Sequence, residues 1–419
     1  MTGRKNVTAA DSEPLSIGLF TYTTLPRGSV VHTAHLADAL HAAGIDVTVY
    51  ALDPVGRGFF RPMRAPLALV PAAAPASSPS ELLRQRTGEL ARFFARVGTR
   101  HHIHHAGDSL TGNGLLDLRA QGNPVAVVRT IHHVERFDDA FMAQCQDRSV
   151  RKAGLCLAVS EATEREVALT FGVQCRRIGN GVDMDRFTQV DLKRVAAWRT
   201  RLPAGAGPLL LAIGGVEERK NTVRILRAFA RLRRRFAQAQ LWILGGATVL
   251  DHRAYRAEFE RELGALPPAT RAAVVELGVV GEDDLPALLR LANVLTLPSL
   301  HEGFGLAALE ALAAGLAVVA SNRAPFTEFL DPSCATLVDP LSDQSIADGV
   351  MAALGTTAAF RQAARQQARA HTWQSVAAAH IEHYRRLLGH DPAIMTATAA
   401  PEHTPTAALR RVGLRPARA

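Results

Sequence analysis

Two series of short apolar segments, separated by helical patterns, constrain the fold of this chain more than any other feature. The first series lies at 15–20, 46–52, 125–131 and 155–160, and the second at 209–214, 241–245, 292–298, 316–320 and 335–338. Between them, apolar residues recur at helical spacing, as in the segment from His32 to Gly44. Strands that alternate with helices form parallel sheets covered on both faces. The sequence therefore predicts an α/β fold.

The spacing of the two series predicts two domains. The chain has 419 residues, and a domain commonly holds about 100–200 residues. We expect a disordered N-terminus at 1–14, a first Rossmann-like domain at 15–180, a linker at 181–207, a second Rossmann-like domain at 208–371, a last helix at 372–388 and a disordered tail at 389–419.

A positive net charge of +9 results from 48 Lys and Arg residues against 39 Asp and Glu residues. The positive excess suits recognition of phosphate by arginine, or binding to an anionic membrane surface or to nucleic acid. A compositional bias that implies no partner explains the charge equally well. Aromatic residues make up only 5% of the chain, and no signature of a nucleic-acid-binding module is present. We therefore expect no nucleic-acid partner.

Cysteine usage and the distribution of apolar residues favour a cytoplasmic protein. The four cysteines form no C-x-x-C pair, which indicates a reduced environment without structural zinc. Charged residues interrupt the first twenty positions, where a secretory signal needs an apolar run. No run of about 18 apolar residues occurs, so we expect no transmembrane helix. Peripheral contact with the inner face of the membrane stays open.

The segment SLHEGFGLAALEALAAG (299–315) carries the strongest indication of a ligand site. It follows an apolar strand, and ligands of open α/β sheets bind beyond such strand ends. Gly303 and Gly305 allow close approach of the backbone, and free N–H groups at the following helix start suit a diphosphate. Glu302 and Glu310 are eight residues apart, or roughly 12 Å along a helix. That span suits carboxylates on a hexose and a ribose, and exceeds the about 5–9.5 Å of a glycosidase pair. A charged loop residue and a solvated helix residue are the alternative interpretations.

Two other strand ends carry candidate residues. AIGGVEERKNTVRILRAF (212–229) leaves a strand at two glycines and enters a helix near Thr222, a suitable N-cap. Arg219 and Lys220 lie in this loop, where they could stabilise a departing nucleoside diphosphate; surface charges before a basic helix are the alternative. His132, with His133 beside it, follows a first-domain strand and could contact the donor sugar or phosphate, although a single histidine is more often structural.

As a set, these segments resemble glycosyltransferase family 4, a retaining family with the GT-B fold, in which two Rossmann-like domains face each other across a cleft. The interval from Glu302 to Glu310 is similar to the E-x7-E motif of the family. The segments that share the resemblance are PSLHEGFGLAALEALAAG, ASNRAPFTEFL, the GGVEERKN loop, IGNGVDMDRF (178–187) and LPRGSVVHTAHLADAL. The similarity extends over 15–388 in the order of the family.

The resemblance implies transfer of a hexose from a nucleoside diphosphate sugar to a hydroxyl acceptor (a small molecule, glycan or lipid), with retention of configuration and without a metal or other cofactor. The implied roles are Glu310 at the donor ribose hydroxyls, Glu302 beside the reacting carbon, Gly303 and the amides of Phe304, Gly305 and Leu306 at sugar and phosphate, Arg219 and Lys220 at the diphosphate, His132 facing the donor, and Gly28 under the phosphates. The last helix is implied to cross back onto the first domain.

Two positions depart from the family pattern. Many members carry arginine directly after the first glycine of the second-domain loop, where this chain has Gly215. We expect Arg219 to supply that charge. The usual P-N-G-V-D begins with Gly179 here, a change that we expect to affect loop stiffness more than chemistry.

Two other classes of protein are alternatives to a glycosyltransferase. Gly303, Gly305 and Ala308 match the G-x-G-x-x-A pattern of an NAD-dependent Rossmann oxidoreductase. That motif also needs an acidic residue near the end of the next strand, about 20 residues on. The next strand ends at Ser321-Asn322 without one. A basic nucleic-acid-binding protein is the second alternative, suggested by the charge alone.

Two further segments leave alternatives open. The histidines of HHIHHAGD, at 101–105, lie at another strand end. They suggest either a metal site or, more in keeping with their spacing, an acceptor-site or loop role near Asp108. A helix at 80–97, capped by Ser78, is rich in arginine. It either packs on the core with a solvated arginine face, which we favour, or rests on an anionic membrane.

Overall fold

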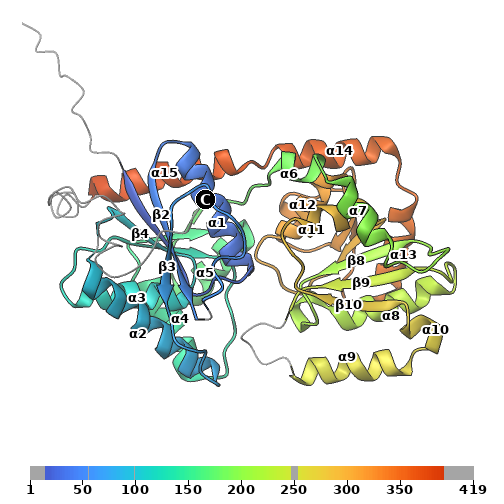
Figure 1. Cartoon of the computed structure of the whole chain (residues 1–419), viewed down its shortest axis with the longest axis horizontal. Coiled ribbons are helices and arrows are strands. Elements are labelled where there is room, and N and C mark those ends of the chain that lie inside the picture. The colour runs from blue at the N-terminus through green and yellow to red at the C-terminus, as the bar shows by residue number, and fades with distance from the viewer. Residues whose placement is uncertain (1–14, 55, 99, 247–252, 391–419) are drawn as a thin grey trace, which may run out of the picture.

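The computed structural model describes residues 15–54, 56–98, 100–246 and 253–390, which form two α/β domains side by side (Figure 1). Each domain contains a parallel sheet with helices on both faces. The predicted fold class is therefore confirmed. The expected disorder of 1–14 and 391–419 concerns segments outside these ranges. No helix within the ranges is long and apolar enough to cross a membrane.

The first domain is built on a sheet of seven strands, counted over the described residues. They are β1 (Ser16–Thr21), β2 (Asp46–Asp53), β3 (Leu67–Pro71), β4 (Ile103–Ala106), β5 (Val127–Ile131), β6 (Leu155–Ala158) and β7 (Arg176–Arg177). Their order in the sheet is β3-β2-β1-β4-β5-β6-β7. The helices of this domain are α1 (Gly28–Ala42), α2 (Pro79–Val97), α3 (Ser109–Ala120), α4 (Ala140–Arg151) and α5 (Glu161–Phe171).

Both faces of the first sheet are buried, which explains the unbroken apolar runs of its strands. Leu19 of β1 belongs to a core shared with Leu36 of α1. The next residue, Phe20, packs on the opposite face with Phe94 of α2, and the two ring centroids are 5.3 Å apart. Successive strand side chains point to opposite faces, so a strand covered on both sides is apolar at most positions.

Polar side chains fix the starts of four helices in the first domain. Ser78, Asp108, Asp139 and Ser160 each accept a hydrogen bond from the backbone N–H three residues further on. This bond satisfies one of the free N–H groups at a helix start. The predicted cap at Ser78 is thereby confirmed.

The second domain contains six strands in the part of the chain that the structure describes. They are β8 (Leu209–Ile213), β9 (Gln240–Leu244), β10 (Val274–Gly278), β11 (Val294–Leu297), β12 (Ala317–Ser321) and β13 (Thr336–Val338), in the order β10-β9-β8-β11-β12-β13. Its helices are η1 (Glu218–Lys220), α8 (Thr222–Arg233), α9 (Arg253–Ala265), α10 (Pro268–Arg271), α11 (Asp284–Leu291), α12 (Leu306–Ala314), η2 (Phe326–Glu328), α13 (Asp343–Leu354) and α14 (Ala358–Arg369). One face of the sheet packs on α11 and α12, and the other on α8 and α13.

The segment 181–207, which we expected to be the linker, carries α6 (Met184–Thr188) and α7 (Leu192–Arg199). α6 lies against α12 and α7 against α11. Trp198 of α7 is buried next to Trp242 of β9, with ring centroids 6.1 Å apart. These two helices thus pack with the second domain.

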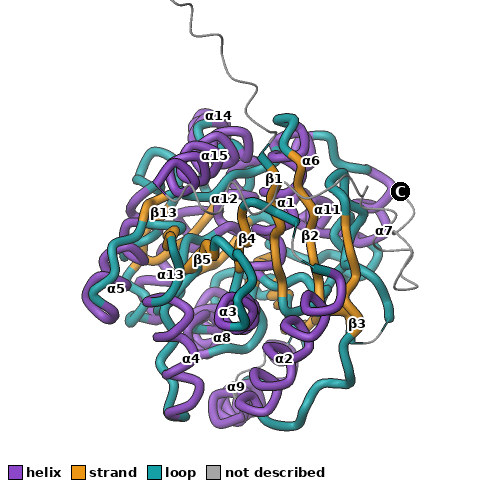
Figure 2. The backbone as a smooth tube through the Cα atoms, turned by 90° about the vertical axis from the view of Figure 1, so that its left-hand side faces the viewer, coloured by secondary structure: helices purple, strands orange, loops and turns teal. Residues whose placement is uncertain are grey.

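The last helix, α15 (Trp373–His390), lies on the first domain, on the side away from α2 and α3 (Figure 2). It packs on α1, where Trp373 stacks on His35 with centroids 5.2 Å apart. Two connections therefore run between the domains, and they are joined to each other. The backbone N–H of Val182 donates to the carbonyl of His371 over 3.0 Å.

Several local predictions need correction. The chain forms β3 and β10, neither of which is predicted from the sequence. Both are edge strands, whose existence depends on a neighbouring strand more than on their own pattern. α1 begins at Gly28 and not at His32, because the chain already enters the helix after Arg27, which is in extended conformation.

The histidines at 101–105 are buried in the first domain. They lie in or directly before the central strand β4, and all four are buried. His101 bonds to the hydroxyls of Ser16 (2.8 Å) and Tyr50 (2.9 Å), and His105 to those of Thr130 and Tyr384 (both 2.6 Å). In the described ranges no group of three or more His, Cys, Asp or Glu side chains is placed to hold a metal ion. The expected acceptor-site role is wrong because these side chains serve the core.

The arginine-rich helix α2 packs on the core. Leu83, Leu90 and Phe94 are buried, whereas Arg84, Arg92 and Arg96 are exposed. Arg86 departs from the solvated pattern, because it is buried and lies 2.6 Å from the carboxylate of Glu89. This is the arrangement favoured above.

The junction between the two connections should be sensitive to a single added methyl group. A Cβ on Gly181 would lie 2.4 Å from the backbone nitrogen of Trp373, and backbone atoms cannot move aside as a side chain can. We expect Gly181→Ala to lower the free energy of unfolding by about 1–3 kcal/mol, as overpacking does, measured by urea denaturation. The control is Gly264→Ala in α9, where the added Cβ meets open space and should stabilise by about 0.5–1 kcal/mol. Equal stability of the two variants would contradict this packing.

Candidate active site

The two sheets direct corresponding edges at each other. The strand order changes direction between β1 and β4 in the first sheet and between β8 and β11 in the second, and ligands bind at such points in open α/β sheets. The loop after β5 touches the loop after β11, because a Cβ on Gly303 would lie only 1.7 Å from the carbonyl oxygen of His132. Only glycine permits this approach.

Glu302 lies between two cations in the loop before α12. The Nζ atom of Lys220 is 2.5 Å from its Oε2 atom, and Nη1 of Arg219 is 4.0 Å from its Oε1 atom. The loops are also joined through the backbone, since the N–H of Leu300 donates to the carbonyl of Arg219 over 2.8 Å. The structure thus brings Glu302 together with Lys220, which lies 82 positions earlier in the sequence, and with the adjacent Arg219.

The charge of Glu302 is determined by these cations. Burial raises the pKa of its carboxyl group, but Lys220 and Arg219 lower it more, so that the pKa falls to about 2. Glu302 is therefore ionised at neutral pH. A diphosphate that enters here competes with this carboxylate for the same two cations.

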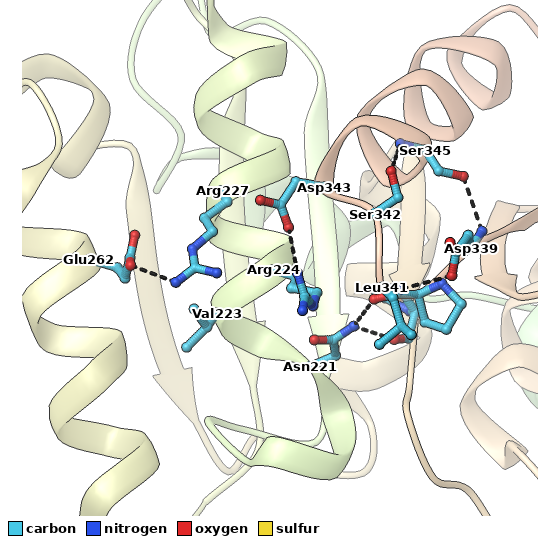
Figure 3. A network of polar contacts seen from close by, with 12 residues as sticks. Asn221, Val223, Arg224, Arg227, Glu262, Asp339, Leu341, Ser342, Asp343 and Ser345 are labelled. Carbon is cyan, nitrogen blue, oxygen red and sulfur yellow. Dashed lines mark hydrogen bonds and ion pairs between the residues drawn. The ribbon is translucent and has the colours of Figure 1, made fainter.

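Asn221 fixes the loop that carries the cations. Its backbone has a φ of 62°, and its side-chain amide donates to the carbonyl oxygens of Pro298 (2.9 Å) and Pro340 (2.6 Å). Figure 3 shows this side chain between the start of α8 and the loop before α13. Asn221 and not Thr222 is the residue before α8, while the Thr222 hydroxyl donates to the carbonyl of Gly215 over 2.8 Å.

Ion pairs along α8 hold the same helix against its neighbours (Figure 3). Arg224 lies 3.3 Å from Asp343 of α13, and Arg227 lies 2.6 Å from Glu262 of α9. Lys220 lies two residues before the start of α8, so these contacts help to position the loop that carries it.

The start of α12 is shaped by Gly305. Its φ of 103° favours glycine, and a Cβ there would lie 2.5 Å from the ring of Phe326. No side chain in the described part of the chain caps this helix, so the N–H groups from Leu306 onward are suited to an anion. Phe304 is buried and stacks on Phe329 at 4.8 Å; its backbone alone can therefore face a ligand.

The spacing argument for the two glutamates needs correction. α12 begins at Leu306, so Glu302 lies in the loop and only the second half of the interval is helical. The roughly 12 Å expected from a continuous helix therefore does not apply.

Glu310 lies one turn into α12, where its surroundings differ from those of Glu302. Its side chain is 9% exposed, and the neighbouring Arg186 is already paired with Glu282 over 2.6 Å. Burial raises the pKa of Glu310 to about 7, with Arg186 lowering it and Glu282 raising it. The two carboxyl groups of the motif thus have opposite pKa shifts for identifiable reasons.

His132 and Gly28 lie on the first-domain side of the junction. The His132 side chain is packed against His32, with ring centroids 4.9 Å apart, and burial holds its pKa well below the ordinary value. Gly28 is the first residue of α1, a helix whose start has no side-chain cap. A Cβ on Gly28 would meet no atom within 4 Å, so this helix start is open to a ligand.

The loop after β8 also explains the departure at Gly215. The φ of Gly215 is 74°, and a Cβ on the facing Gly245 would lie 2.6 Å from its backbone nitrogen. The loops after β8 and β9 thus touch through their backbones. Arg219, at 4.0 Å from Glu302, places a guanidinium group near the carboxylate instead.

Family models match both halves of the chain. The model described as Glycosyltransferase Family 4 matches residues 26–186, and the model described as Glycosyl transferases group 1 matches residues 197–371. Glycogen synthase of Mycobacterium tuberculosis is 30% identical over 84% of this chain and 89% of its own length. The chain belongs to glycosyltransferase family 4. The oxidoreductase and nucleic-acid-binding alternatives are thereby set aside.

Other relatives and solved structures agree with this family. The MMP alpha-(1->4)-mannosyltransferase of Mycolicibacterium hassiacum is 26% identical over 89% of this chain and 98% of its own. Sucrose-phosphate synthase from Thermosynechococcus elongatus superposes with a TM-score of 0.72 at 22% identity, covering 90% of this chain and 100% of that one. Anabaena HepE, in complex with UDP and glucose, gives 0.69 at 16% identity, covering 88% and 99%. The fold of this family-4 glycosyltransferase is GT-B.

Two groups at the junction were missed by the sequence argument. The carboxylate of Glu328 accepts hydrogen bonds from the backbone N–H groups of Glu161 and Ala162, both at 2.8 Å, and so caps α5 from the other domain. His133 lies 2.5 Å from Glu135. Neither contact follows a local spacing rule, although the position of His133 after a strand end was a usable signal.

The raised pKa of Glu310 predicts that the wild type and the Glu310→Gln variant differ in their free energy of unfolding by an amount that depends on pH. Because its folded pKa of about 7 lies above the ordinary 4.5, the folded protein binds the proton more tightly, and stability falls as pH rises from 4.5 to 7. We expect Glu310→Gln to lack this loss. The variant should equal the wild type near pH 4.5 and exceed it by about 2–3 kcal/mol above pH 7, measured by urea denaturation across pH. A pH-independent difference would contradict the buried carboxyl group.

Proposed function

We propose that this enzyme transfers a hexose from a nucleoside diphosphate sugar to a hydroxyl acceptor, with retention of configuration and without a divalent metal. One observation carries the proposal: Lys220 and Arg219 converge on Glu302 beside the uncapped start of α12. Two cations and a helix start together favour a diphosphate, and a carboxylate beside them suits the hydroxyls of the sugar.

Relatives support the class of donor. Glycogen synthase and a mannosyltransferase are similar over most of this chain, and HepE has been determined with UDP-glucose. In the proposed arrangement the diphosphate lies at Lys220 and Arg219, the sugar at Glu302 and the ribose at Glu310. The backbone from Gly303 to Leu306 would line the path between them.

The proposed reaction assigns the acceptor proton to the donor itself. The bond between the anomeric carbon and the diphosphate oxygen breaks, the acceptor oxygen bonds to the same face of that carbon, and the hydroxyl proton moves to the departing phosphate oxygen. Lys220 and Arg219 stabilise the negative charge that develops on the diphosphate. The half-buried His132, whose pKa lies well below its ordinary value, is suited to orienting the sugar as a neutral group.

Two substitutions should separate binding from turnover. We expect Glu302→Gln to lower kcat by about 10–100-fold, because it changes the charge next to the reacting carbon and the cations. Glu310→Ala should weaken donor binding by about tenfold, because it removes an acceptor for the ribose hydroxyls. Calorimetry with UDP, GDP and ADP, followed by kinetics with the matching sugar donor, measures both effects.

The control is Asp348→Asn, which removes an exposed carboxylate from α13 and should change neither quantity. Addition of EDTA should leave the rate unchanged if no divalent metal takes part. Unaltered kinetics in both glutamate variants, or no binding of any nucleoside diphosphate, would overturn the proposed function.

A further inference from the structure

A second polar group lies at the same junction, on the first-domain side. Nε2 of His133 is 2.5 Å from Oε1 of Glu135, and their side chains are 35% and 26% exposed. By contrast, His32, His105 and His380 are buried. His133 therefore presents an imidazole to solvent where these three histidines do not.

The loop of this pair is held in place from α4. The Gln146 side chain accepts from the backbone N–H of Glu135 (3.0 Å) and donates to the carbonyl of the same residue (2.8 Å). Two such bonds fix both the position and the orientation of the Glu135 backbone. The pair is consequently ordered without any contribution from a ligand.

The pair faces the donor-side residues. His133 directly follows His132, whose carbonyl touches Gly303, and it is one of the groups that lower the pKa of Glu302. Its ring lies at a steep angle to that of His301, in the loop after β11, with centroids 6.4 Å apart.

Electrostatic contacts extend across the junction. Burial raises the pKa of Glu135, but the hydrogen bond and charge of His133, together with Arg219 and His301 from the second domain, bring it below the ordinary value. The carboxylate of Glu135 thus interacts electrostatically with Arg219 and His301, in the second-domain loops that carry the proposed donor site.

We infer that His133 and Glu135 form an acceptor subsite that binds a carbohydrate through neighbouring hydroxyl groups. The inference rests on the proposed function and adds the class of its second substrate. A carboxylate has two oxygens with several acceptor positions, so Glu135 can bind hydroxyls while it retains His133. Imidazole offers a donor or an acceptor beside it. Such a pair matches adjacent hydroxyls on a sugar ring.

The same features disfavour a lipid alcohol. An alkyl chain needs apolar surface to leave water. Near this point the ion pairs instead place several partly exposed polar side chains: His133, Glu135, Arg219, His301 and Glu166, the last 3.9 Å from His301. Hydrogen bonds to fixed polar groups also explain why a sugar would be selected over water, since unpaired polar groups are costly once the site closes.

The test compares transfer with hydrolysis, because water as acceptor does not use the subsite. The donor is whichever of UDP-glucose, ADP-glucose and GDP-mannose the full chain hydrolyses fastest. The acceptors are glucose, mannose, myo-inositol, glucose 6-phosphate, maltose and, as the lipid-like probe, 1-octanol. We expect Glu135→Gln and His133→Ala to lower kcat/KM for the best sugar acceptor by about tenfold, mainly through KM. Hydrolysis and nucleoside diphosphate affinity should stay within about twofold of the wild type.

Asp147→Asn is the matched control. It removes a carboxylate from the residue next to Gln146, but that side chain pairs with Arg151 at 2.6 Å on the exposed face of α4, so transfer should be unchanged. Full sugar transfer in the two variants, preference for 1-octanol, or an equal loss of hydrolysis would each overturn the subsite. A wild type that binds and hydrolyses no donor would refute the proposed function first, and the two failures are thereby distinguished.

Discussion

The contact between the backbone of Gly303 and the carbonyl of His132 is the constraint on which the rest of the site depends. Because this contact involves backbone atoms and a glycine, no smaller side chain could bring the two loops closer together. Glu302 lies immediately before this contact and His133 immediately after it on the other strand end. Glu328 reinforces the same approach by capping α5 with two hydrogen bonds of 2.8 Å. Main-chain geometry thus decides which side chains face each other.

Within that geometry, one short segment holds two carboxyl groups in opposite states. Glu302 is surrounded by Lys220 and Arg219, whose charges outweigh its burial, whereas Glu310 has a nearby cation that is already paired with Glu282. The difference follows from how close a cation lies. Nζ of Lys220 is 2.5 Å from Glu302, even though the adjacent Arg219 is itself paired with Glu217 at 2.8 Å, whereas the Arg186 guanidinium near Glu310 lies 2.6 Å from Glu282. One consequence is that the cations which suit a diphosphate are engaged by a carboxylate of the protein in the absence of one.

Most of the fold could be predicted, and so could the position of the candidate donor residues after strand ends, because these signals are local. Buried strands read as apolar runs, and the interval from Glu302 to Glu310 lies in one continuous segment. The predictions were wrong where the local structure depends on a contact with residues distant in the sequence. The edge strands β3 and β10 exist through their neighbours, the histidines at 101–105 find their hydroxyl partners on β1, β2, β5 and α15, and Glu328 caps a helix 166 positions earlier.

The buried histidines show how polar groups can occupy this junction without altering its charge. Nδ1 of His32 donates to the side-chain oxygen of Asn180 over 2.6 Å, and burial lowers the pKa of His32 to about 4. For His380 of α15 burial lowers the pKa to about 3. Both are therefore neutral at pH 7. Positive charge beside Glu302 then comes from Lys220 and Arg219 of the second domain. An anionic donor of the proposed kind would consequently be drawn towards α12, and this would leave the first-domain side, with His133 and Glu135, to the uncharged hydroxyls of the proposed acceptor.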